Sequence, residues 1–447
     1  MMIDHWMQFG TFAQKDYFEY PKVGMYKGVI INANMAAYAP AGLAAFLLEK
    51  TSSTCYMIDP LTHAFQHNPE VVRNQTGEPK SSVKSLAEAY GEPVASKVGS
   101  RPILPEELAT DDALYCLVEK CVEYQRRQLK DFIETSDAAK YLDNQALSGP
   151  YAIIPPYFYM TETSAEEWLP ININSAKYTL EHLREVHQKV FASIVIGQGI
   201  LVDENIRRMI LEEFLSLDVN GYLLWIDDFD EQAASRAELI AFLNLARDLR
   251  THGTREVINL HGGYFSALAA GTMGSGALSG VSHGPEFGEY RSVIPVGGGI
   301  PIARYYIPEL HTRIRYRDAV RMFNEKNWLE TAKTFHENVC DCPECVRTIA
   351  DDPGNFRLFG ESNVKNIRRG GGIVRIDYPK PETKERCLRH YLERKYREFT
   401  AASDANPQVL RENLKSGVSK YKDVAGLEGV SHLIKWEKAL SQQAQTD

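Results

Sequence analysis

The chain has 447 residues, of which 44% are hydrophobic and 24% are charged, as in an ordinary globular protein with a large core. Its apolar runs are far too short to span a bilayer, and its first ten residues lack the charged-then-apolar layout of a signal peptide. The seven cysteines are odd in number and partly clustered, which excludes an ordinary disulfide framework. We therefore predict a cytoplasmic protein with no membrane segment.

Charge is distributed unevenly along the chain. The net charge is −9, but the segment 357–438 has 18 Lys and Arg against 11 Asp and Glu, so that it carries +7 and the remainder −16. An acidic body with a basic C-terminal region fits a protein that meets a phosphate backbone with one face. A solvated helical surface would give the same pattern, and both interpretations stay open.

Strand-like and helix-like segments alternate through most of the chain. In chain order, strands are predicted at Gly28–Asn32, Thr54–Ile58, Tyr151–Pro155, Ser193–Ile196, Tyr222–Ile226, Val257–Leu260 and Ala277–Val281. Helices are predicted at Ala41–Glu49, Val202–Leu217, Ala233–Thr251 and Ser266–Ala270. Strands separated by helices of this length indicate βαβ units and a parallel sheet. About eight such units, without a GxGxxG fingerprint, favour a TIM (β/α)8 barrel over a doubly wound sheet.

The alternation stops after about Asp318, where the cysteine cluster and the basic helices begin. We therefore assign residues 1–330 to the barrel, with a polar insertion near 80–140. Residues 331–447 are assigned to a zinc-binding, basic helical subdomain.

Polar or glycine-rich residues follow several predicted strands. They are Asp59, Gly197–Gly199, Asp227–Asp228, His261–Gly263 and Ser282–Gly284. A TIM barrel builds its active site at these strand ends. Asp59 precedes a proline, so it is extended and projects from the strand end, although it could equally cap a loop. Asp227 and Asp228 face opposite ways, so only one can enter the barrel mouth, and the second could instead cap the next helix. His283 could act as a general base or simply pack.

Three thiols lie within six residues in a CxCxxC segment that contains one proline. Such a turn can point three thiolates at one tetrahedral ion, and a fourth ligand must close the site. The preferred fourth ligand is His390, on a helix predicted at Thr383–Phe399, with His336 and Cys387 as alternatives. Reduced cysteines without metal and an iron–sulfur cluster are the competing interpretations. The predicted ligands of a structural zinc ion are Cys340, Cys342, Cys345 and His390.

The CxCxxC cluster and its following histidine-bearing helix resemble the zinc subdomain of the queuine and archaeosine tRNA-guanine transglycosylases. Further motifs follow the family's order, over about residues 28–400. Ile58–Gln66 (IDPLTHAFQ) resembles the family's DSGGFQ, Ser193–Gly199 (SIVIGQG) resembles its IVQGG, and Asn220–Ile226 (NGYLLWI) resembles its Asp-Gly-Tyr strand.

The resemblance implies a pentosyltransferase that exchanges a guanine base in RNA, or in one branch DNA, for a 7-deazaguanine. In that family a carboxylate attacks the anomeric carbon. By position, Asp59 would lie in the base pocket and Gln198 would contact the base, and Gly262 and Gly263 are assigned to the same pocket. The chain departs from the family where the nucleophilic aspartate is expected, because residues 280–285 read GVSHGP. The candidate catalytic residues are therefore Asp59, Asp227 and Asp228, with His283 as proton shuttle.

Three functions are compatible with these residues. The preferred one is base exchange on tRNA or DNA, with Arg368 and Arg369 of a flexible RRGGG loop contacting phosphate. The second is a non-catalytic relative in an antiviral-defence or DNA-modification gene cluster. The third is a hydrolytic glycosidase or nuclease that uses Asp59 and Asp227. The protein partners considered are a product of the same gene cluster and a second copy of the chain, giving a homodimer.

Overall fold

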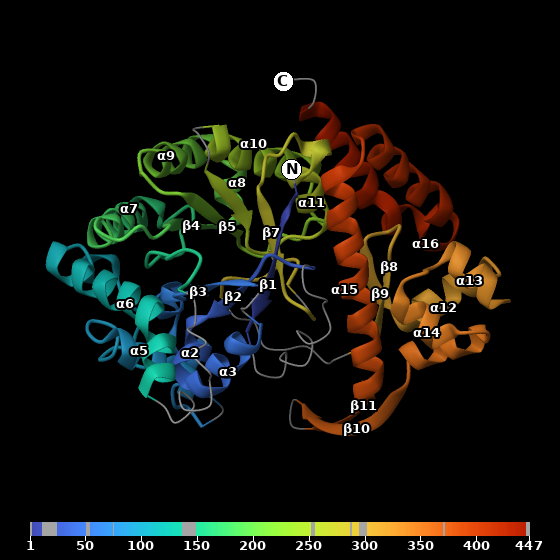
Figure 1. The fold of residues 1–447 in the computed structure, drawn as a ribbon, viewed down its shortest axis with the longest axis horizontal. Coiled ribbons are helices and arrows are strands. Elements are labelled where there is room, and N and C mark those ends of the chain that lie inside the picture. The colour runs from blue at the N-terminus through green and yellow to red at the C-terminus, as the bar shows by residue number, and fades with distance from the viewer. Residues whose placement is uncertain are drawn as a thin grey trace. The chain divides into compact units, whose positions relative to one another are not determined.

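The computed structural model describes residues 2–10, 25–50, 54–74, 76–135, 149–251, 255–286, 288–294, 302–369 and 372–443. Contacts divide these residues into two compact units, whose elements are labelled in Figure 1. The sheet unit contains the described residues from 3 to 294, and the C-terminal unit contains those from 302 to 443. This contact-based division lies near residue 297, and residues 304–315 form an antiparallel hairpin on its C-terminal side.

The sheet unit is built on seven strands, all paired in parallel. They are β1 (Asp4–Phe9), β2 (Gly28–Asn32), β3 (Cys55–Asp59), β4 (Phe191–Ile196), β5 (Gly221–Ile226), β6 (Glu256–Asn259) and β7 (Gly280–His283). Their order in the sheet is β3-β2-β1-β7-β6-β5-β4. The first and last strands are thus neighbours, and the sheet curls into a half-barrel (Figure 1).

The strand predicted at Tyr151–Pro155 is present only as isolated bridges. The N–H of Tyr151 donates to the carbonyl of Tyr56 in β3 at 2.7 Å, and Ile153 forms a parallel bridge with Val190, next to β4. The predicted strand ends in two consecutive prolines, which have no N–H to donate to a regular ladder.

Helices cover the sheet between successive strands. They are α2 (Ala33–Tyr38), α3 (Pro40–Lys50), α4 (Pro69–Val72), α5 (Ser81–Tyr90), α6 (Asp111–Thr135), α7 (Ala165–His182), α8 (Gln198–Val202), α9 (Glu204–Leu215), α10 (Arg236–Thr251) and α11 (Tyr264–Ala270). Short 3-10 turns are η2 (Thr62–Gln66), η3 (Pro105–Glu107) and η5 (Thr272–Gly274).

The expected insertion near 80–140 supplies α5, η3 and α6, and its residues 136–140 lie outside the described residues. The side chain of Gln125 in α6 exchanges two hydrogen bonds with the backbone of Ile154 (2.8 and 2.9 Å), so α6 belongs to the core.

Strand geometry decides which side chains face the inside of the curled sheet. The inner core contains Trp6, Met57, Leu223 and Trp225, among others. Side chains alternate along a strand, and parallel neighbours in register point the same way. Asp59 and Asp227 therefore face inward, two residues after Met57 and Trp225. His283 faces the helices instead, because it is in register with Met7, the residue after Trp6.

The C-terminal unit combines two antiparallel hairpins with helices. The hairpins are β8 (Arg304–Ile307) with β9 (Thr312–Arg315) and β10 (Ser362–Arg369) with β11 (Gly372–Pro379). The helices are α12 (Tyr316–Glu325), α13 (Ala332–Asn338), α14 (Pro343–Ile349), α15 (Pro381–Asp404) and α16 (Pro407–Gln443), with the 3-10 turn η6 at Pro353–Phe359. α15 contains the helix predicted at Thr383–Phe399.

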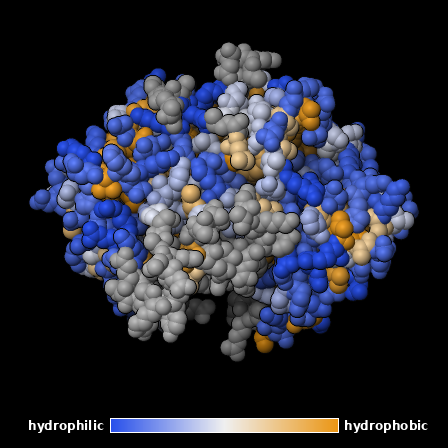
Figure 2. Space-filling model, viewed as in Figure 1, coloured by the Kyte–Doolittle hydropathy of each residue, from blue (hydrophilic) through white to orange (hydrophobic). Residues whose placement is uncertain are grey.

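The surface seen in Figure 2 is mainly hydrophilic, with small separate hydrophobic patches. In the part of the chain that the structure describes, no helix combines the length and the apolar content that crossing a membrane requires.

Candidate metal centre and strand-end cluster

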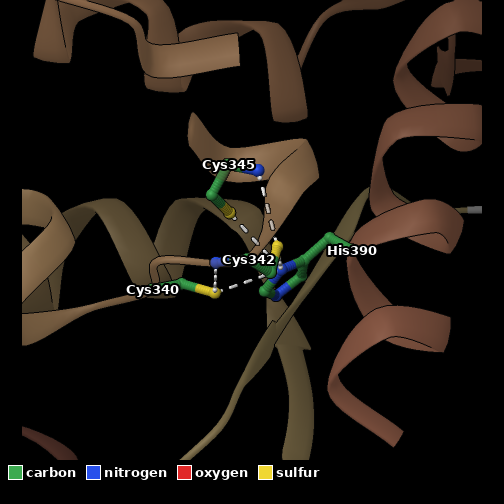
Figure 3. Close-up of side chains that lie close together, drawn as sticks. All are labelled: Cys340, Cys342, Cys345 and His390. Carbon is green, nitrogen blue, oxygen red and sulfur yellow. Dashed lines mark hydrogen bonds between the residues drawn. The ribbon is translucent and has the colours of Figure 1, made fainter. Parts of the chain in front are cut away.

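Three cysteines and one histidine point toward one another in the C-terminal unit (Figure 3). His390 Nδ1 lies 3.6, 3.3 and 3.4 Å from the Sγ atoms of Cys340, Cys342 and Cys345, and all four ligand atoms lie within 4.8 Å of one another. A tetrahedral ion bonded at about 2.3 Å to sulfur and about 2.0 Å to nitrogen gives N···S separations of about 3.5 Å. The four side chains could therefore hold one metal ion.

The turn that carries the cysteines is shaped by backbone hydrogen bonds to sulfur. The N–H of Cys342 donates to Cys340 Sγ, and the N–H of Cys345 donates to Cys342 Sγ, both at 3.4 Å. Cys342 thereby caps the N-terminus of α14, with a proline at the first helical position. Burial opposes ionisation of Cys340, but the neighbouring thiols and His390 outweigh it and hold the pKa of Cys340 well below its ordinary value.

His390 reaches the cysteines from α15 with its ring orientation fixed. Its Nε2–H donates to the carbonyl of Tyr306 at 2.7 Å, and its ring stacks on Tyr305 at 4.3 Å between centroids. Nδ1 is therefore left for a metal, an arrangement typical of histidine ligands. The alternatives are engaged elsewhere: His336 Nδ1 contacts the carbonyl of Cys340 at 3.0 Å, and the thiol of Cys387 donates to the carbonyl of Phe359 at 3.4 Å.

A buried carboxylate supports the same region. Glu398 accepts hydrogen bonds from the hydroxyl of Tyr306 (2.7 and 2.8 Å) and from Nδ1 of His311 (2.8 Å), and Lys395 Nζ lies 3.2 Å away. Burial alone would raise the pKa of Glu398, but Lys395 and His311 outweigh it and lower the pKa to about 2. Tyr306 thus links two groups: its backbone carbonyl accepts from His390, and its hydroxyl donates to the ionised carboxylate of Glu398.

A second group of polar and aromatic side chains gathers near the C-terminal ends of the parallel strands. We call it the strand-end cluster, and it consists of Asp59, His63, Tyr157, Trp225, Asp227, His261 and Arg291. Asp59 is buried and accepts hydrogen bonds from the Tyr157 hydroxyl at 2.7 Å and the Leu61 N–H at 3.0 Å. Burial raises the pKa of Asp59, and these bonds and the charge of Arg291 only partly oppose the rise.

Two buried histidines flank Trp225 in this cluster. His63 stacks on Tyr157 at 5.3 Å and meets Trp225 edge-on at 5.1 Å, and His261 meets Trp225 at 4.8 Å. Burial, reinforced by the charge of Arg291, lowers the pKa of His261 to about 3 and holds that of His63 well below its ordinary value. Both rings are therefore neutral, and Nδ1 of each lacks a hydrogen-bond partner among the residues that the structure describes.

His261 was among the strand-end residues predicted from the sequence but was given no role, and His63 and Arg291 were not predicted as site residues. His63 lies inside the IDPLTHAFQ motif, and His261 directly follows a predicted strand, so sequence features could have predicted both as site residues. No sequence feature pointed to Arg291. Its guanidinium lies 5.7 Å from the centre of the Trp225 ring, and its carbonyl accepts the indole N–H at 2.9 Å.

The side chains of Asp227 and Asp228 have different surroundings, as their adjacent positions predict. Asp227 accepts hydrogen bonds from the Tyr159 hydroxyl at 2.8 Å and from the Val293 N–H at 2.7 Å. Asp228 is exposed, with φ of 50°, and its N–H donates to the Arg291 carbonyl at 3.1 Å. Asp228 does not cap α10, which begins eight residues later.

The predicted base-contacting residues mainly make contacts within the protein. The side-chain amide of Gln198 donates to the carbonyls of Asp227 and Asp228 at 3.1 and 2.8 Å. A Cβ on Gly262 would lie 2.7 Å from three side chains, and one on Gly263 would lie 3.0 Å from an oxygen of Glu231. Close packing therefore requires glycine at Gly262, and Gly263 has little room for a side chain.

Of the other predicted site residues, His283 faces the opposite side of the sheet from the cluster, and Arg368 and Arg369 belong to the C-terminal unit. His283 is buried on the helix-facing side, where its Nε2 lies 2.8 Å from Nε2 of His5. Arg368 and Arg369 belong to β10 by their backbone, and their side chains lie outside the described residues.

No protein-family model matches the chain, and no curated protein sequence matches it.

Proposed function

We propose that this chain is a tRNA-guanine transglycosylase-like protein that exchanges a guanine or 7-deazaguanine base in nucleic acid. The observation that carries the proposal is the position of Asp59. This carboxyl is buried at the inner end of β3, within the IDPLTHAFQ motif that resembles the family's DSGGFQ, and it is surrounded by side chains suited to a planar base.

The proposal includes a complete (β/α)8 barrel, with residues 149–160 as its fourth strand. Two observations support closure. The segment bonds to both edge strands of the sheet, through Tyr151 to β3 and through Ile153 and Met160 alongside β4. The first and last strands, β1 and β7, are paired, as a closed barrel requires.

We assign zinc to the Cys3His group. Thiolate and imidazole are the ligands that zinc prefers, and four protein ligands leave no coordination position for a substrate. The ion would stabilise the fold of the C-terminal unit and take no part in the chemistry.

In the proposed reaction, a carboxylate oxygen forms a bond to the sugar C1′ while the bond from C1′ to the guanine nitrogen breaks. The incoming base then reverses these changes. The raised pKa of Asp59 suits it to holding a proton for the departing base, and neutral His63 and His261 can hydrogen-bond a heterocycle. Asp227 is a second inward carboxylate, which could attack the sugar once the Val293 N–H releases it.

A non-catalytic binding protein is the second candidate. At the end of β7, where the family places its nucleophile, the inward side chain is Ser282, and His283 faces the helices. This arrangement favours a relative that binds its ligand without exchanging a base.

Exchange of labelled guanine into tRNA and into DNA tests the proposal. Wild-type protein should incorporate label into one polymer, and Asp59→Asn should lower the rate by about 10²- to 10⁴-fold, the usual loss on removing a general acid or base. Asp218→Asn is the matched control, because that side chain is exposed and precedes the N-terminal end of β5, opposite the strand end that carries the cluster, and it should leave the rate unchanged. Folded, metal-loaded wild type without exchange on either polymer would favour the binding protein, and full activity in Asp59→Asn would show that the active site is elsewhere.

A further inference from the structure

A groove of about 320 Å³ lies in the C-terminal unit, between the start of α12 and the β10–β11 hairpin. Its walls include Arg315, Tyr316 and Arg317 on one side and Ser362 and Ile376 on the other. Small-ligand sites have volumes of about 300–1,000 Å³, so the groove has room for one nucleotide. Its residues are separate from both the metal centre and the strand-end cluster.

Tyr316 provides a fixed aromatic wall in this groove. A Cβ on Gly360 would lie 2.0 Å from the Tyr316 ring, so the ring is in direct contact with the glycine backbone. The ring also packs against Phe356, with 5.3 Å between centroids. Burial raises the pKa of Tyr316 to about 12, which keeps its hydroxyl neutral. A ring held in this way loses little conformational entropy when a base stacks on it.

The two arginines beside Tyr316 give the groove an excess of positive charge. Arg317 is paired with Asp377 at 3.0 Å. Arg315 is exposed, and no carboxylate among the described residues pairs with it. The nearby carboxylate of Glu361 is already paired with Arg357 and Lys380, at 3.1 and 2.8 Å. An anion would therefore meet at least one uncompensated guanidinium.

We propose that this groove binds one nucleotide of a single-stranded nucleic acid, with its phosphate on Arg315 and its base against Tyr316. A cationic groove with an aromatic platform is the general solution for single strands. The choice of a nucleic acid as the ligand rests on the proposed function. The positive charge of Arg315 and the position of the Tyr316 ring are independent of that function.

Binding of a labelled single-stranded oligonucleotide of about 12 nucleotides, as RNA and as DNA, tests the groove by fluorescence anisotropy over a range of salt. Arg315→Ala should weaken binding and reduce the log–log salt slope by about 0.7, the value for one phosphate contact on a single strand. The matched control is Arg321→Ala on α12, because Arg321 is paired with Glu325 at 3.2 Å. It should leave the slope unchanged.

The aromatic contact has its own pair of variants. Tyr316→Ala should weaken binding about 5- to 100-fold, the equivalent of one base stack, and Tyr316→Phe should bind as wild type. Metal content and circular dichroism establish that each variant is folded. The proposed nucleotide site would be contradicted if Arg315→Ala left the salt slope unchanged. It would also be contradicted if Tyr316→Phe and Tyr316→Ala lost the same binding affinity. Because binding is measured without guanine exchange, loss of exchange with intact Arg315-dependent binding would reject only the proposed reaction.

Discussion

The metal centre and the strand-end cluster are assembled in different ways. Three of the four ligands at the metal centre come from one six-residue turn, and only His390 arrives from elsewhere. The strand-end cluster draws its side chains from the ends of separate strands, from η2, from the segment that holds Tyr157 and from the loop that holds Arg291. Local spacing therefore fixes most of the first site, whereas the register of a whole sheet fixes the second.

The two sites also differ in how their polar atoms are satisfied. At the metal centre, His390 uses one ring nitrogen for a carbonyl and turns the other to the thiols. In the strand-end cluster, Nδ1 of His63 and Nδ1 of His261 have no hydrogen-bond partner within the described part of the chain. A buried polar atom without a partner costs about 1–3 kcal/mol. We therefore expect the first site to stabilise structure and the second to suit a ligand that supplies the missing partners.

Removing one thiolate should have the largest effect. Cys342→Ser should abolish binding of about one zinc per chain, and the C-terminal unit should lose on the order of 10 kcal/mol of metal-binding free energy, which exceeds the margin of most domains. Metal analysis and thermal unfolding measure both effects. Cys116→Ser, at an exposed cysteine, should keep its metal. Full zinc in the Cys342 variant would refute the ligand assignment.

The buried carboxylate behind the metal centre should give the next largest effect. Glu398→Gln removes the ionised partner of the buried Lys395 and should cost about 3–5 kcal/mol at neutral pH. The folded pKa of about 2 lies below the unfolded value of about 4.3, so this contribution is full above pH 4.3 and is lost as the pH falls toward 2. Urea unfolding of wild type and variant should therefore converge in acid.

The control for this substitution is Glu337→Gln. Glu337 is exposed and pairs with Lys333 at 3.8 Å, so its loss should cost less than about 1 kcal/mol. A cost for Glu398→Gln that is equally small, or that does not change with pH, would contradict the role assigned to the buried carboxylate.

The smallest effect is expected at the strand-end cluster, where Asp227 tethers the loop that carries Val293. Asp227→Asn keeps one acceptor oxygen and loses one of two hydrogen bonds, so it should destabilise the protein by about 1 kcal/mol and speed hydrogen exchange of the Val293 amide. Asp228→Asn should do neither. If the Val293 amide exchanges at the same rate in Asp227→Asn as in the wild type, Asp227 does not hold this loop. The carboxylate would then be more readily available for the chemistry.

The sequence predicted the strands whose residues are apolar throughout. The run at Gly28–Asn32 matches β2, because a strand buried on both faces reads as a short apolar block. β1 was missed, since Asp4, His5 and Gln8 interrupt its apolar pattern. Their partners are the side chains of Lys27 and His283 and the carbonyl of Leu260, all distant in the chain. No local pattern reveals that such polar residues will be satisfied in a core.

By itself, the sequence determined the parallel α/β class and the CxCxxC turn, because periodicity and short ligand spacing are local properties of the chain. It also selected His390, since a helix after the turn was the natural source of a fourth ligand. The tertiary structure alone decided that Asp59 faces inward and accepts a hydrogen bond from Tyr157, on which His63 stacks, and that His283 faces the helices. It also decided that Tyr316 and Arg315 border a groove. Strand register and the packing of distant segments set these placements, and one residue of shift would turn each strand's side chains to the opposite face.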